Sequence, residues 1–151
     1  MRNLAIAALK NHLSVLTEFT ILDPVYAPML EGNMDDVFQR KFINMFPIIC
    51  LDYRSEARTR MNQGFNRVYP GRIIVAVLAV GDIETAQENL FKYVSDEDYI
   101  LDRLYSTPTP AVNGTNLYLD IKATIPGNYK ESEDNRFYFS EIIPCNIELI
   151  K

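Results

Sequence analysis

The sequence has few of the residues that build catalytic and metal centres. Its 151 residues include one histidine, two cysteines, six glycines and no tryptophan. A single histidine cannot supply the His/Cys or His/carboxylate sets that bind zinc and similar metals. Cys50 and Cys145 each lie in an apolar, strand-like run, and a free cysteine packs as a small hydrophobic residue. We expect both to be reduced core residues, with no metal or cofactor bound.

The catalytic motifs that depend on glycine or histidine are also missing. The segment 68–72 has one glycine and leads into a predicted strand, whereas phosphate-binding loops lead into a helix. A Ser-His-Asp arrangement would need His12, but Ser14 lies two residues away on the same predicted helix, so the two side chains diverge. We interpret His12 as a helix-surface residue. These absences predict that the chain is not an enzyme and has no catalytic residues.

The charge and hydropathy disfavour three further classes: membrane-spanning, secreted and nucleic-acid-binding proteins. No apolar run approaches the length of a membrane span, and residues 1–12 enter a helical pattern without a signal-peptide design. The net charge of −5 disfavours wholesale nucleic-acid binding, because such binders are normally basic. We expect one domain over residues 1–151, made in a cytoplasm and without membrane contact.

Hydrophobic periodicity predicts an α+β fold, an antiparallel sheet of four to five strands with one long and one or two shorter helices packed on it. Helices are predicted over residues 2–17, 34–45 and 82–105, the last with a second cap signal at 95–98 where it kinks or restarts. Strands are predicted over residues 19–22, 46–53, 72–80, 117–125 and 137–150.

Three of these segments carry more specific expectations. Residues 72–80 are almost continuously apolar, which predicts a strand covered on both faces. Pro144 interrupts the last strand and indicates an edge position or a bulge. Residues 126–136 are too polar for a core, and we interpret them as a projecting hairpin tip.

A basic segment joins the strands at 46–53 and 72–80. It contains five arginines and one acidic residue, Glu56, a local charge of +4 in an acidic chain. Arginine rather than lysine favours bidentate contacts with carboxylates or phosphates. We interpret residues 54–66 as a polar loop that contacts DNA or an acidic partner surface, or else as a solvated connector. The candidate interaction residues are Arg54, Arg58, Arg60, Arg67 and Arg72.

The order of elements resembles one protein family. A short N-terminal helix is followed by a strand that opens at Phe46-Pro47, a polar loop, and a long strand ending at Val80. A helix beginning at Asp82 and two more long strands complete the chain. This pattern, over nearly the whole length, looks like the tail-terminator (tail-completion) proteins of long-tailed bacteriophages.

The resemblance implies a structural role in the virion, at the neck of the tail. Such proteins form a hexameric ring on the head-proximal end of the tail tube, stop its polymerisation and join it to the head connector. The implied partners are copies of the same chain, the tail-tube protein, the head–tail connector and DNA in the channel. Two alternatives remain, a head-closure (stopper) protein on the capsid side and a small soluble enzyme with an unrecognised site.

Overall fold

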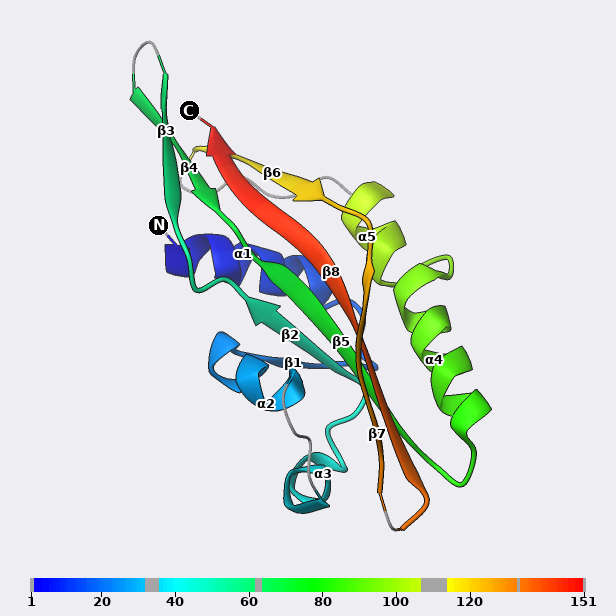
Figure 1. Ribbon diagram of the computed structural model, residues 1–151. Coiled ribbons are helices and arrows are strands. Elements are labelled where there is room, and N and C mark those ends of the chain that lie inside the picture. Colours follow the sequence, from blue (N-terminus) through cyan, green and yellow to red (C-terminus); the bar gives the residue numbers. More distant parts are fainter. Residues whose placement is uncertain (1, 32–35, 62–63, 107–113, 133, 151) are drawn as a thin grey trace.

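The computed structural model describes residues 2–31, 36–61, 64–106, 114–132 and 134–150. The helices are α1 (Arg2–Leu13), the 3-10 helix η1 (Pro24–Tyr26), α2 (Ala27–Glu31), α3 (Asp36–Phe42), α4 (Ile83–Ser95) and α5 (Ile100–Ser106). The strands are β1 (Thr20–Leu22), β2 (Ile48–Asp52), β3 (Ala57–Met61), β4 (Gly64–Tyr69), β5 (Arg72–Val80), β6 (Asn116–Ile121), β7 (Ile125–Glu131) and β8 (Arg136–Ile150). They form one sheet in which β8 is central (Figure 1).

Strand β8 is long enough to pair with different neighbours along its two halves. Its first half lies between β5 and β7, and its second half lies between β4 and β6, all antiparallel. Strands β4 and β5 are consecutive along one edge of β8, and β6 and β7 are consecutive along the other. Each edge of β8 is therefore occupied by a line of two strands. The sheet extends further through β2 and β1 beyond β5, and through β3 beyond β4.

Pro144 lies inside this central strand and not at an edge. The expected irregularity is present on one side, because the register of β8 shifts between the pairs Ile121–Cys145 in β6 and Ile125–Ile142 in β7. The Pro144 carbonyl accepts a hydrogen bond from Lys122 N, whereas Cys145 N donates to the Gly71 carbonyl on the opposite side. The missing N–H of Pro144 therefore faces the break between β6 and β7, because the N–H and C=O of one strand residue point the same way. The proline therefore removes no hydrogen bond between β8 and its neighbours at this position.

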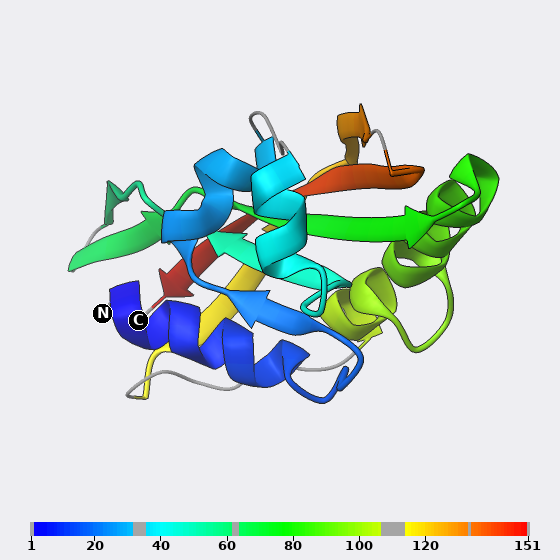
Figure 2. The same cartoon turned by 90° about the horizontal axis from the view of Figure 1, so that it is seen from below.

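Helices cover both faces of the sheet, as the apolar pattern of β5 predicts (Figure 2). On one face α1, α4 and α5 pack on a core that includes Leu9, Leu90 and Ile147. On the other face η1, α2 and α3 pack on a smaller core around Tyr138. The Tyr138 hydroxyl donates to the Leu30 carbonyl at 2.7 Å, which ties α2 to β8.

The α+β class is confirmed, but the sheet is larger than predicted and is mixed. It has eight strands rather than four or five, and β1 runs parallel to β2. The predicted helix over 2–17 ends at Leu13. Helix α3 falls within the predicted 34–45, of which positions 34 and 35 and the cap at Asn33 lie outside the described residues.

The predicted C-terminal half needs two corrections. The strand expected over 117–125 is β6, which ends at Ile121. Residues 126–136, expected to form a projecting polar tip, mostly belong to β7, which pairs with β8 from Ile125 to Glu131. The polar residues were misleading because β7 is an edge strand whose side chains are largely exposed. By contrast, the cap at Asp82 is confirmed, since its side chain accepts a hydrogen bond from Glu84 N. The restart is confirmed as well, because α4 ends at Ser95 and α5 begins at Ile100.

Buried polar groups connect α1 to α5. His12 is 5% exposed, so the expectation of a surface position was wrong. Its Nε2 lies 3.1 Å from the Arg103 carbonyl oxygen, and Arg103 Nε donates to the His12 carbonyl at 2.9 Å. Cys50 and Cys145 are buried and free, as expected, and burial raises their thiol pKa values to about 12 and about 11.

His12 predicts an acid-sensitive step in stability. Burial, the largest effect, and the nearby Arg103 charge lower the pKa of His12 below 6.5. The folded protein therefore binds this proton less readily than the unfolded chain, and stability falls as the pH drops from about 6.5 through the lower folded pKa. We expect the His12→Gln variant to lose this part of the slope when urea unfolding is measured between pH 7.5 and 5. An unchanged slope would contradict this role.

Candidate functional site

The basic segment is a β-hairpin rather than the loop that the sequence indicates. Strands β3 and β4 pair antiparallel from Ala57–Val68 to Met61–Gly64, and the hairpin extends beyond the rest of the molecule at one end (Figure 1). The sequence contains a strand pattern here, which the charged residues obscured. Arginine alternates with smaller or apolar residues from Ala57 to Met61, which is the period of a strand.

The register of the hairpin gathers three of the five candidate arginines. Position 58 lies directly opposite position 67, and position 60 lies two residues from 58 on the same strand. Residues opposite each other, or two apart in a strand, share one face. Positions 58, 60 and 67 therefore share a face of the hairpin, whereas Arg54 precedes β3 and Arg72 begins β5.

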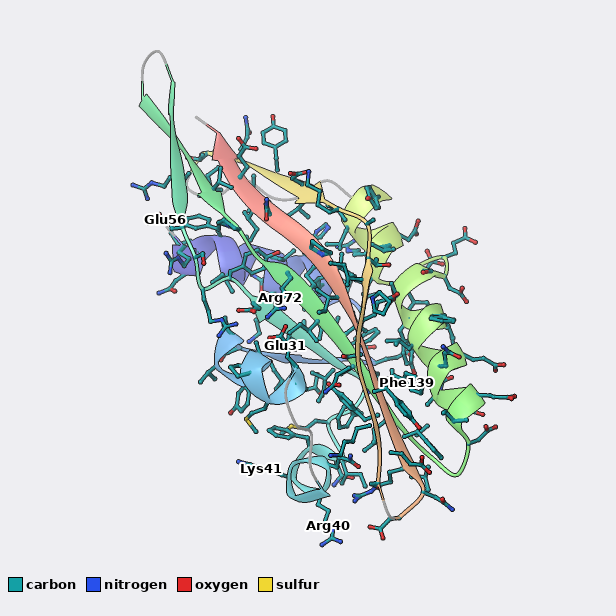
Figure 3. All side chains as sticks on the ribbon, in the orientation of Figure 1. Glu31, Arg40, Lys41, Glu56, Arg72 and Phe139 are labelled. Carbon is teal, nitrogen blue, oxygen red and sulfur yellow. The ribbon has the colours of Figure 1, made fainter. Side chains whose placement is uncertain are left out.

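Arg54 and Arg72 converge instead on the buried carboxylate of Asp52. Arg54 approaches it side-on, with Nε 2.6 Å from Oδ1 and Nη2 2.9 Å from Oδ2. Arg72 Nε lies 2.9 Å from Oδ2, and the Arg72 guanidinium also pairs with Glu31 at the end of α2 (Figure 3). These two arginines are thus held in ion pairs that join β2, β5 and α2 at the base of the hairpin.

The electrostatics of this cluster favour an ionised Asp52. Burial alone would raise the pKa of Asp52, but the hydrogen bonds from Arg54 and Arg72, with their charges, hold this pKa below its usual value. The Asp52 carboxylate is 5% exposed, so it relies on the two guanidinium groups for the solvation that water would otherwise provide.

Close packing fixes the junction between the hairpin and the sheet. The Tyr53 hydroxyl donates to the Cys145 carbonyl at 2.6 Å, and its ring lies against Gly71, where a Cβ atom would collide with the ring and with the Asp52 carbonyl oxygen. Tyr69 at the end of β4 is fully buried. The hairpin is therefore packed against the sheet at its base, where β4 leads into β5.

Helix α1 adds basic residues that the sequence analysis did not connect with this region. Arg2 lies 5.9 Å above the Tyr69 ring and 3.8 Å from the Glu56 carboxylate. Arg2, Lys10 and Arg54 line a depression of about 560 Å³ between α1, the start of η1 and the segment that follows β2. A second depression, of about 440 Å³, lies over the Asp52 cluster. No local pattern could reveal this grouping, because about fifty residues separate α1 from Arg54.

No protein-family model matches the chain, and no curated protein matches it. No helix in the described ranges is long and apolar enough to cross a membrane.

The Asp52 cluster yields a test of the hairpin base. We expect Asp52→Asn to lower the free energy of unfolding at pH 7 by about 1.5–3 kcal/mol, the usual contribution of hydrogen bonds to charged groups. Because the folded pKa lies below 3.8, this contribution is present above that pH and is lost as the pH falls through the folded pKa. Urea unfolding of the variant and the unmodified protein should therefore differ at pH 7, and the difference should narrow as the pH falls below 3.8.

Asp120→Asn is the matched control, since Asp120 forms only a half-exposed pair with Lys122 among the ion pairs described. Exposed pairs contribute up to about 1 kcal/mol. Equal losses in the two variants at pH 7 would contradict the assigned role of Asp52.

Proposed function

We propose that this chain is a structural virion protein that forms a hexameric ring at the head-proximal end of a phage tail tube. The ring ends tube polymerisation and joins the tail to the head connector. The observation that carries the proposal is the β3–β4 hairpin, which extends beyond the body of the subunit and has arginine at positions 58, 60 and 67. A projecting strand pair with a defined face provides a contact surface for a neighbouring copy.

The rest of the described surface supports an assembly role. Strands β1 and β3 lie at the two ends of the strand order and each pair along one edge within the described residues, and such edges pair readily with other chains. Apolar side chains are exposed at several places on the surface. They include Val80 at 70%, Tyr105 at 67%, Phe91 at 52% and Tyr118 at 52%. Exposed aromatic residues are enriched in protein–protein contacts.

Electron microscopy of tails assembled without this protein tests the proposed position directly. If the ring ends polymerisation, tubes made in its absence should be heterogeneous and longer than normal, and adding the purified protein during assembly should restore a uniform length. The control is the same amount of protein added in its unfolded form, with the final urea concentration equal in both reactions. Tails of normal length that fail to join filled heads would place the protein on the capsid side. Normal, infectious particles would contradict any neck role.

A further inference from the structure

Charge is strongly separated along the chain. Residues 54–72 carry five arginines and one glutamate, whereas residues 82–98 carry six acidic residues and one lysine. The second segment therefore has a charge of −5, equal to that of the whole chain. The hairpin lies at one end of the molecule, and α4 begins at the opposite end (Figure 1). One subunit thus presents a basic surface and an acidic surface in different places.

The acidic surface comprises the outer side of α4 and its two ends. Glu84 and Glu88 lie on the helix, which also carries Lys92, and the other acidic residues, Asp82 and those at 96–98, flank it. The inner face is buried through Ala86, Leu90 and Val94. On the outer side Phe91 is 52% exposed. The exposed Glu84 and Glu88 lie on the same stripe of the helix, because positions 84, 88 and 91 follow one another at helical spacing. Exposed apolar side chains bordered by charges are the usual composition of a protein contact.

The hairpin has an internal arrangement that is unfavourable in an isolated chain. Position 58 and position 67 are both arginine and lie directly opposite each other. Like charges at directly opposed positions destabilise a strand pair. An acidic partner surface placed over this face would neutralise the repulsion.

We propose that the basic hairpin of one copy docks on the acidic outer face of α4 in the next copy. The inference rests on the proposed function, because it names the contact through which the ring closes. Two different surfaces on one subunit make a head-to-tail contact, which generates a ring when the rotation closes. A second copy fits both surfaces, since it supplies the acidic partner for the hairpin and covers Phe91. DNA would use the hairpin and leave the α4 face exposed.

Two charge-reversed variants test the contact. Variant A carries Arg58→Glu and Arg60→Glu in the hairpin, and variant B carries Glu84→Arg and Glu88→Arg on α4. Each variant alone brings like charges together at every contact, so both should remain monomers in light scattering where the unmodified chain forms a ring. When mixed, the acidic hairpin of A meets the basic helix of B, and the basic hairpin of B meets the acidic helix of A. The mixture should therefore form a ring in which A and B alternate.

The variants should fold, because the changes are local. Arg58→Glu places opposite charges across the hairpin, and Glu84→Arg removes one favourable interaction with the helix dipole. The control is Asp120→Arg with Glu131→Arg, which changes the charge as much as variant B does, at exposed positions on β6 and β7. This control should assemble alone. Arg58→Ser with Arg60→Ser provides a second hairpin variant, whose ring should dissociate at a concentration at least about tenfold higher than that of the unmodified ring.

Different results would contradict the proposed contact and the proposed ring. If variants A and B each form rings alone, the contact lies elsewhere, and the proposed ring is unaffected. The same conclusion follows if their mixture stays monomeric while the control assembles. If variant A forms a normal ring but no longer binds double-stranded DNA, the hairpin faces DNA and the inference fails. An unmodified chain that stays monomeric, alone and with tail-tube protein, would remove both the inference and the proposed function.

Discussion

Strand β8 hydrogen-bonds along both edges over nearly its whole length, and this ladder organises the rest of the fold. The breaks in its neighbours, at residues 70–71 and 122–124, lie at the level of Pro144. The sheet can bend there because Pro144 has no N–H and so needs no acceptor on that side. As a result the first half of β8 carries helices on both faces, while the second half supports the hairpin. The long strand thus connects the packed body to the projecting element.

The hairpin depends on its base for its direction. Buried Asp52 draws Arg54 and Arg72 together, and Arg72 also reaches Glu31 on α2. Gly71 lets the Tyr53 ring approach the backbone where β4 becomes β5. The five arginines therefore divide into two groups with different physical roles. Arg54 and Arg72 hold the base together, whereas positions 58, 60 and 67 form the basic face that a partner can approach.

Sequence patterns predicted the parts of the fold that depend on local signals. Residues 72–80 form β5 with the expected bounds, and Asp82 caps α4, because an apolar run and a capping side chain act over a few residues. The hairpin was missed since its charged residues indicated a loop. The burial of His12 and the Asp52 cluster could not be predicted, because their partners, Arg103 and Glu31 with Arg72, lie at least twenty residues away in sequence. The sequence identified the arginines but not their division into two groups.

The central claim is that this protein works through a closed assembly of its own copies. Sedimentation of the unmodified chain over a wide range of concentration, at low and moderate salt, tests this claim most directly. A closed ring predicts a single larger species of fixed mass that appears with increasing concentration, does not grow further, and weakens as salt screens the charged contact. A monomer at every concentration, or a series of ever larger species, would contradict the account.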